Sequence, residues 1–347
     1  MTMPSPLCPW RMQVHHITQE TPDVWTLALL CHDQYRWRAG QYALVSINNS
    51  PDTLRAYTIS ATPGVSPFIT LTVRRIENGV GSGWLTGQVK RGDYVWLSDA
   101  QGDFTCDRDD NDRFLLLGAG CGVTPIISMR RWLATYRPEA DVAVIYNVRT
   151  PQDVIFADEW REYPVTLMAE QQATLGFLEG RISREVLAAV PDIASRTVMV
   201  CGPAPYMDAV EQMARELGVT RVRKETFFTP AAAPASGGLK FTTLHPAREF
   251  YGPVGTTLLE ALESNRVPVN AACRAGVCGS CKTRVLSGEY TVSSTMTLTD
   301  KEIADGYVLA CSCHPQSDLA LASRSRVIGN RTGGLHRPFL FDYRHCA

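Results

Sequence analysis

Four cysteines have the spacing of an iron–sulfur site. Cys273, Cys278 and Cys281 stand in a C-x4-C-x2-C arrangement, and Cys311 follows further along the chain. This is the spacing of a plant-type 2Fe-2S cluster, which exchanges one electron at a time. Such a cluster needs an electron donor and an acceptor, so the rest of the chain should contain a site that supplies electrons.

Two alternatives stay open at this loop. Zinc also binds four thiolates, but usually from two short C-x2-C pairs. Here one loop carries three cysteines, and Gly276 and Gly279 let backbone N–H groups approach the sulfur atoms, which favours the cluster. Cys313 lies two residues after Cys311, and spacing does not decide which of the two is the fourth ligand.

A glycine-rich turn between a buried strand and a helix indicates a dinucleotide site. The apolar run 114–117 leads into the turn, and a helix over 126–136 follows it. Glycines there let a pyrophosphate approach the backbone at the helix N-terminus. A second predicted strand, 197–201, ends at the same ligand-binding edge of the sheet. The candidate residues are Gly118, Gly120, Gly122, Thr124, Pro125, Cys201, Gly202 and Pro203.

Two further motifs indicate a flavin site. Arg55 can bind a phosphate, Tyr57 can stack on a planar ring, and Thr58 offers a hydroxyl. The Gly-Val-Gly-Ser sequence at 79–82 follows a strand and forms a second candidate phosphate cradle. The candidate residues are Arg55, Ala56, Tyr57, Thr58, Val73, Arg74, Gly79, Gly81 and Ser82.

Changes of pattern divide the chain into domains that would position these motifs. Residues 10–108 contain about six strand-like runs and predict an antiparallel β-barrel. Residues 109–230 alternate strands with helices and predict an α/β doubly wound parallel sheet. Residues 231–238 read as a flexible linker that lets the last domain swing. Residues 239–322 mix a hairpin, short helices and the cysteine loop, and 323–347 lack periodicity and read as a disordered tail.

Individual helices and strands are predicted from the periodicity of apolar residues and from turn-forming residues such as glycine and proline. The predicted strands are 12–17, 24–31, 41–48, 54–60, 68–76, 94–98, 142–147, 197–201, 282–286 and 318–322, with a hairpin of 239–244 and 248–251. The predicted helices are 83–89, 126–136, 158–163, 206–217 and 257–264, the last opened by a capping box like the one at 299–302.

Composition excludes several classes of function. A net charge of −1 argues against a nucleic-acid partner. The apolar run 114–129 is short and broken by glycine and proline, so we expect no membrane span. No secretory signal is evident, so we expect a cytoplasmic protein whose 11 cysteines are not a disulfide framework.

Over residues 10–322 the chain resembles the ferredoxin–NADP reductase superfamily fused to a C-terminal plant-type ferredoxin. The matching motifs are R-x-Y-T at 55–58, G-x-x-S-x-x-L at 79–85, the turn at 118–125, C-G-P at 201–203, E-x-F at 225–227 and L-A-C at 309–311. The resemblance implies an FAD-binding barrel, an NAD-binding domain and a β-grasp ferredoxin domain. It also implies Cys311 as the fourth ligand.

The resemblance implies a mechanism as well. Hydride would pass from nicotinamide C4 to flavin N5, and single electrons would then pass to the cluster. Thr58 would hydrogen-bond near N5, Cys201 would line the hydride path, and Phe227 of the Glu225–Phe227 motif would cover the flavin ring. FAD rather than FMN, and NADH rather than NADPH, are implied by the family alone, since Arg149 could tolerate a 2′-phosphate.

Segments 8–16, 148–153 and 292–296 are similar to family members that reduce hybrid cluster protein, an acceptor tied to nitric oxide and hydroxylamine detoxification. The resemblance therefore implies hybrid cluster protein as the partner. We expect this protein to be a monomer that binds the partner transiently through complementary charges. One alternative is the reductase component of an oxygenase or epoxidase, which shares the domain order. Another is an iron–sulfur redox sensor or a zinc-binding interaction module.

Overall fold

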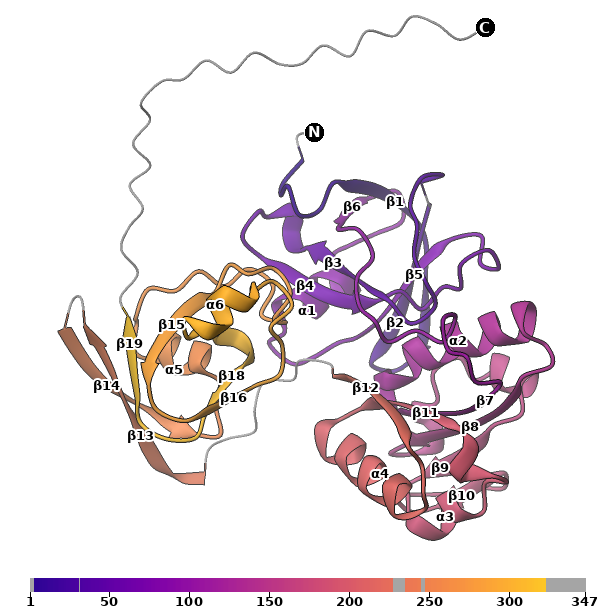
Figure 1. Ribbon diagram of the computed structural model, residues 1–347. Helices are drawn as coiled ribbons and strands as arrows, with labels where there is room; N and C mark the ends of the chain where they lie inside the picture. Colours follow the sequence, from indigo (N-terminus) through magenta and orange to yellow (C-terminus); the bar gives the residue numbers. More distant parts are fainter. Residues whose placement is uncertain (1–2, 31, 227–234, 245–246, 323–347) are drawn as a thin grey trace, which may run out of the picture.

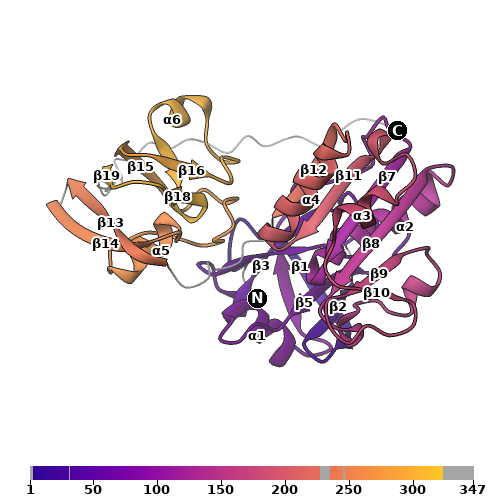
Figure 2. The ribbon, with the colours of Figure 1, turned by 90° about the horizontal axis from the view of Figure 1, so that it is seen from below.

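The computed structural model describes residues 3–30, 32–226, 235–244 and 247–322. The described part contains three bodies, each built around one main sheet (Figure 1). Seen from below, the barrel lies between the other two (Figure 2), and hydrogen bonds join it to each of them. The predicted tail, 323–347, lies outside the described residues.

The first body is an antiparallel barrel. Its strand order is β4-β3-β6-β1-β2-β5, and an isolated bridge between Ile59 and Leu71 brings the two edges together. Inward-facing aliphatic side chains fill it, because alternate residues of a strand point to one face. The elements are β1 (Trp10–Thr21), β2 (Val24–Leu29), β3 (Tyr42–Ser46), β4 (Leu54–Thr58), β5 (Ile69–Arg74), α1 (Val80–Gly87) and β6 (Tyr94–Leu97).

The second body is a six-stranded parallel sheet with the order β10-β9-β8-β7-β11-β12. Helix α2 packs on one face of the sheet, and α3 and α4 pack on the other (Figure 1). The strands are β7 (Arg113–Ala119), β8 (Asp141–Val148), β9 (Thr166–Ala169), β10 (Phe177–Glu179), β11 (Thr197–Gly202) and β12 (Arg221–Thr226). The helices are α2 (Val123–Tyr136), α3 (Arg184–Ala188) and α4 (Ala204–Glu216).

The third body has a mixed sheet of order β14-β13-β19-β15-β17 and a small sheet of β16 and β18. Both predicted capping boxes are present, at Thr257 with Glu260 and at Thr299 with Glu302. The strands are β13 (Ala235–Leu244), β14 (Ala247–Val254), β15 (Lys282–Ser287), β16 (Tyr290–Val292), β17 (Tyr307–Leu309), β18 (Cys313–Pro315) and β19 (Leu319–Ala322). The helices are α5 (Leu258–Ser264) and α6 (Asp300–Ala304).

The predicted fold class is confirmed, with local corrections. The predicted helix 158–163 is only a 3-10 turn, Glu159–Arg161, because Pro164 prevents continuation. Strand β12 was missed because its Arg and Lys residues give no apolar alternation. Strand β13 begins at Ala235, so the second half of the predicted linker is strand. Among the described residues, no helix combines the length and apolarity needed to cross a bilayer.

Candidate redox site

The four predicted cysteine ligands lie close together in the third body. Cys281 Sγ is 3.3 Å from Cys311 Sγ. Hydrogen bonds among the four thiols lower the pKa of Cys273 to about 2 and that of Cys281 to about 7, and they raise the pKa values of Cys278 and Cys311. A lowered thiol pKa favours the thiolate form that binds iron, so Cys273 and Cys281 ionise most easily.

The loop backbone fits a cluster. Gly276 has φ +71°, which suits glycine, and its N–H donates to Cys311 Sγ at 3.1 Å. The Ala275 N–H donates to Cys273 Sγ at 3.4 Å. A two-iron cluster shares four thiolates between two irons, and the four cysteines supply that donor set.

The structure separates Cys311 from Cys313. Cys311 Sγ contacts Cys281 and the Gly276 N–H. Cys313 lies in β18, where it pairs with Val292 of β16. This arrangement favours Cys311 as the fourth ligand.

The two flavin motifs meet in the barrel. A Cβ atom on Gly81 would lie 2.8 Å from Tyr57 Oη and 2.9 Å from Arg55 Cγ, so this glycine admits the β4 side chains. Thr58 is buried at the end of β4. Ser82 Oγ accepts a hydrogen bond from the Ile76 N–H at 3.1 Å, which holds the turn before α1.

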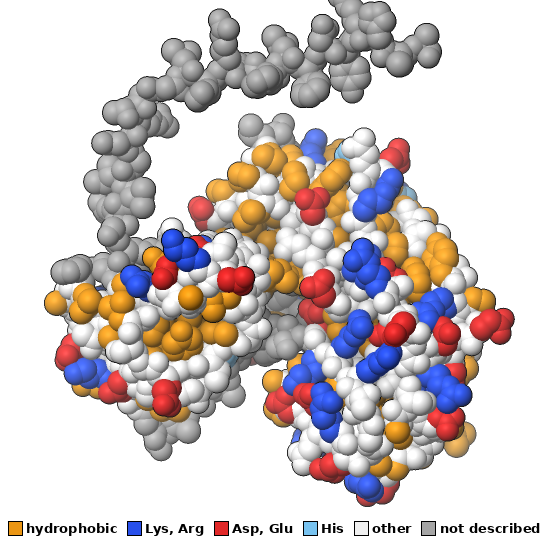
Figure 3. Space-filling view, in the orientation of Figure 1, with side chains coloured by type: hydrophobic (Ala, Val, Ile, Leu, Met, Phe, Trp, Pro, Cys, Tyr) orange, Lys and Arg blue, Asp and Glu red, His pale blue; other side chains and the backbone are white. Residues whose placement is uncertain are grey.

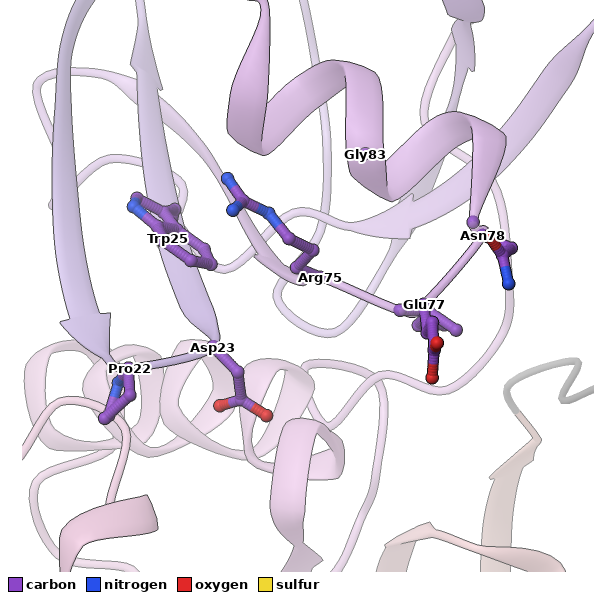
Figure 4. A pocket seen from close by; sticks show the side chains of 9 residues that line it. Pro22, Asp23, Trp25, Arg75, Glu77, Asn78 and Gly83 are labelled. Carbon is purple, nitrogen blue, oxygen red and sulfur yellow. The ribbon is translucent and has the colours of Figure 1, made fainter.

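A depression of about 500 Å³ lies beside this turn (Figure 4). Its wall includes Trp25, with the Arg75 guanidinium 4.3 Å above the ring centroid, and the backbone of Gly79. The volume falls within the range of small-molecule sites. Because Gly79 belongs both to this wall and to the candidate phosphate cradle at 79–82, the depression adjoins the cradle.

The dinucleotide turn forms as predicted between β7 and α2, and it packs on the end of β11. A Cβ atom on Gly122 would lie 2.1 Å from the Cys201 carbonyl oxygen, so only glycine fits there. Gly120 has φ +54°, and its missing Cβ leaves room for Arg74 Nη1 from the barrel. Within the turn, Thr124 Oγ1 donates to the Cys121 carbonyl at 2.9 Å. Gly118, Pro125, Gly202 and Pro203 flank the same contact.

Two of the predicted catalytic residues are neighbours at this edge. Cys201 pairs with Glu225 across β11 and β12. Burial, with a smaller contribution from Asp103, raises the Glu225 pKa to about 7. Phe227 lies outside the described residues. Val73 is buried in β5, and Arg74 forms an ion pair with Asp23 at 3.1 Å.

Glu225→Gln should change how stability depends on pH. The folded pKa of about 7 exceeds the ordinary 4.5, so the native state holds more protons between these values and stability falls as pH rises. Above pH 7 the variant should be more stable by about 1–2 kcal/mol, less than the full shift because the side chain keeps partial contact with water. Below about pH 4.5 the difference should vanish.

Denaturant unfolding at several pH values measures this effect. Glu211→Gln is the control of opposite sign, because Lys224 lowers the pKa of Glu211 and that variant should lose stability at neutral pH. Equal stability of Glu225→Gln and the parent at pH 8 would contradict the prediction.

A contact that the sequence did not indicate joins β4, which carries the predicted flavin motif at 55–58, to the cysteine loop. The Leu54 N–H donates to the Ala272 carbonyl at 2.9 Å, and Arg55 Nη1 donates to the same oxygen at 3.3 Å. Ala272 directly precedes Cys273. An apolar seam surrounds these bonds and comprises Cys8, Leu44, Leu54, Trp96 and Cys273, with Ala56, Ala272, Ala275, Val277 and Cys278 at its margin.

Family models match two of the three bodies. Residues 243–316 match the 2Fe-2S iron-sulfur cluster binding domain, and residues 116–212 match the oxidoreductase NAD-binding domain. The NADH oxidoreductase HCR of Escherichia coli (strain K12) is 77% identical over 322 residues, which cover 93% of this chain and 100% of that protein. The chain belongs to the ferredoxin–NADP reductase superfamily with a fused 2Fe-2S domain.

More distant relatives share the architecture. The glycine betaine monooxygenase reductase subunit of Chromohalobacter salexigens is 28% identical, over 88% of this chain and 93% of that protein. The crystal structure of phthalate dioxygenase reductase, described as a modular structure for electron transfer from pyridine nucleotides to [2Fe-2S], superposes with a TM-score of 0.63 and 25% identity. That match covers 90% of this chain and 98% of that one.

Family membership makes this protein an NADH-dependent oxidoreductase, and its cofactors are FAD, NADH and one 2Fe-2S cluster. The zinc-module alternative is thereby excluded, because residues 243–316 match a 2Fe-2S domain. The redox-sensor alternative loses its basis, because a sensor needs no hydride donor.

Proposed function

We propose that this protein passes electrons from NADH, through FAD and the cluster, to hybrid cluster protein in the cytoplasm. The observation that carries the order of transfer is the pair of hydrogen bonds from Leu54 and Arg55 to the Ala272 carbonyl. They place the residue before Cys273 against the strand that bears the flavin motif. Bound FAD would convert a two-electron hydride into single electrons, which the cluster takes one at a time.

The residues of the barrel would bind and orient the flavin. Arg55 is partly buried, its Cγ borders Gly81 of the Gly79–Ser82 cradle, and its guanidinium would bind a pyrophosphate lying there. Tyr57 would offer its ring face, and Thr58 would donate its hydroxyl to the flavin ring. Ala56 and Val73 would line the site.

The residues of the second body would bind the nicotinamide nucleotide. The turn from Gly118 to Pro125 would present backbone N–H groups to its pyrophosphate. Cys201 and Glu225, paired across β11 and β12, would line the nicotinamide end. With a pKa of about 7, Glu225 can hold or release a proton near neutral pH. Phe227 would shield the flavin, as the family pattern implies.

Two features support the choice of nucleotides. The depression beside Trp25 and Gly79 has the volume for an adenosine group, which FAD has and FMN lacks. Arg149 lies 3.1 Å from Asp153 and 4.0 Å from Asp23, so carboxylates already offset the charge that a 2′-phosphate would need. This favours NADH over NADPH.

Arg55→Ala should weaken flavin binding by about 10- to 100-fold, because a charged hydrogen bond is worth about 1.5–3 kcal/mol. Fluorescence titration of flavin-free protein with FAD measures this affinity. Arg91→Ala, at an exposed position before β6, is the matched control and should bind FAD like the parent. Unchanged affinity in Arg55→Ala would remove this residue from the site.

A protein acceptor suits the surface of the third body. Figure 3 shows apolar side chains gathered on one face of this body, whereas charges of both signs are interspersed over the second body. The exposed large apolar side chains of the third body include Val292, Met296 and Ile303. Apolar patches on a monomer commonly mark contact with another protein. The 77% identity to NADH oxidoreductase HCR favours hybrid cluster protein as that partner.

An anaerobic assay tests the acceptor. NADH, this protein in catalytic amount and purified hybrid cluster protein are mixed, and reduction of the acceptor is followed by electron paramagnetic resonance. We expect rapid reduction that needs both NADH and the protein. A second candidate, suggested by the 28% identity to a monooxygenase reductase subunit, is an oxygenase reductase. Slow reduction of hybrid cluster protein beside fast reduction of an oxygenase component would support that candidate instead.

A further inference from the structure

Two serines outside the cysteine motif hold the cysteine loop in place by hydrogen bonds. Ser294 lies in the segment between β16 and α6, and Ser312 lies between Cys311 and β18. Ser294 Oγ donates to the Gly276 carbonyl at 2.7 Å, and Ser312 Oγ donates to the Ser294 carbonyl at 2.8 Å. We call Ser294 and Ser312 the serine clamp.

The clamp leaves Gly276 little freedom. A Cβ atom on Gly276 would lie 2.7 Å from Ser294 Cβ and 3.3 Å from Ser312 Cβ. The backbone of the segment is fixed as well, because the Ser293 N–H donates to the Ser312 carbonyl at 2.9 Å. Figure 1 shows β16 and β18, which flank the clamp, side by side in this body.

The clamped glycine also donates a hydrogen bond to a ligand sulfur. The Gly276 N–H is 3.1 Å from Cys311 Sγ, while its carbonyl is held by Ser294. Hydrogen bonds to the sulfurs set the reduction potential of iron–sulfur clusters. A donated N–H stabilises the more negative, reduced state, and so it raises the potential.

We propose that the serine clamp is a positioning device that raises the reduction potential of the cluster by fixing the Gly276 N–H on Cys311 Sγ. A higher potential would favour electron flow from the flavin toward the cluster. Neither serine touches the reacting atoms, so both act through Gly276. The proposal rests on the proposed function only in that the four cysteines hold a cluster.

Ser294→Ala tests the clamp. The measurement is the midpoint potential of the cluster in the complete FAD-containing protein, obtained by anaerobic titration with electron paramagnetic resonance. We expect a lower potential, with an approximately three- to tenfold smaller fraction of reduced cluster at a fixed applied potential. Tenfold corresponds to 59 mV for a one-electron couple. Ser312→Ala should shift the potential in the same direction, and the double variant should shift it by less than the sum.

Two further variants make the test specific. Ser293→Ala is the matched control, since its hydroxyl reaches the Ser312 carbonyl only at 3.4 Å, and its potential should equal that of the parent. Ser294→Thr keeps the hydroxyl, so the midpoint potential of its cluster should lie close to that of the parent. If Ser294→Ala loses its cluster on purification, Ser312→Ala and Ser294→Thr still decide the question.

Several outcomes would overturn the proposal. An unchanged potential in both alanine variants would do so, as would an equal shift in Ser293→Ala. A higher potential would also do so, because added water stabilises the reduced cluster and would mean that the serines only exclude solvent. If the parent protein itself held no 2Fe-2S cluster, the proposed function would fail, which is a distinguishable result.

Discussion

Cys311→Ala should abolish electron delivery to a protein acceptor while leaving NADH-driven reduction of small dyes within about twofold of the parent. The reason is geometric, because Cys311 Sγ is 3.3 Å from Cys281 Sγ and receives the Gly276 N–H. Losing outer partners of a metal site costs about 10–100-fold, so loss of a ligand should cost at least about 100-fold in cluster-dependent transfer. Dye reduction should survive because the flavin and nucleotide sites lie in the other two bodies.

The neighbouring Cys313 supplies the matched control. Cys313→Ala removes a fully buried sulfur from β18 and should cost about 1–3 kcal/mol of stability. It should retain the cluster absorbance and reduce the acceptor at the rate of the parent. The reverse pattern, with the cluster lost in Cys313→Ala and kept in Cys311→Ala, would make Cys313 the ligand. Loss of dye reduction in Cys311→Ala would contradict the order flavin before cluster.

Gly122→Ala should disable the use of NADH. Gly122 has φ −60°, which alanine adopts easily, so the effect is purely steric. The new methyl would lie 2.1 Å from the Cys201 carbonyl oxygen and 2.8 Å from the Gly202 N atom. Relieving this overlap must separate the dinucleotide turn from the end of β11. A displacement of about 1 Å in a positioned site costs about 100-fold, so we expect that loss in kcat/KM for NADH.

Steady-state kinetics with a dye acceptor measure the effect, together with thermal unfolding. Overpacking should also lower stability by about 1–3 kcal/mol. Gly87→Ala is the control, because its nearest neighbour is Arg75 Nη2 at an ordinary 3.6 Å and it lies in α1. That variant should gain about 0.4–1 kcal/mol and keep its activity. Parent-like kinetics in Gly122→Ala would show that the turn does not position the nucleotide.

The docked cysteine loop changes the expected behaviour of the third body. The sequence predicts a domain that swings on a flexible linker. In the structure the loop is seated on β4 by two hydrogen bonds to Ala272 and by the apolar seam around Leu54 and Trp96. Part of that linker is strand β13. The docked arrangement therefore holds the residue before Cys273 against the strand that carries the predicted flavin motif.

Local motifs were readable from the sequence because each is made by neighbours in the chain. Three cysteines in one nine-residue stretch, 273–281, meet without help from distant segments. The glycine turn at 118–125 follows from a buried strand, a close backbone approach and a helix start, all within one short segment. Capping boxes at Thr257 and Thr299 are equally local. The sequence alone thus determined the fold class and the three kinds of cofactor, and it predicted the residues that would bind them.

Tertiary structure decided what depends on distant segments. Spacing could not choose between Cys311 and Cys313, because the choice depends on which sulfur faces Cys281 and Gly276 across the fold. The bonds from β4 to Ala272 join residues more than two hundred positions apart and carry no sequence signal. The serine clamp is of the same kind, since a serine is unremarkable until its hydroxyl meets a carbonyl from another segment. Side-chain chemistry specified the sites, and long-range packing specified how they connect.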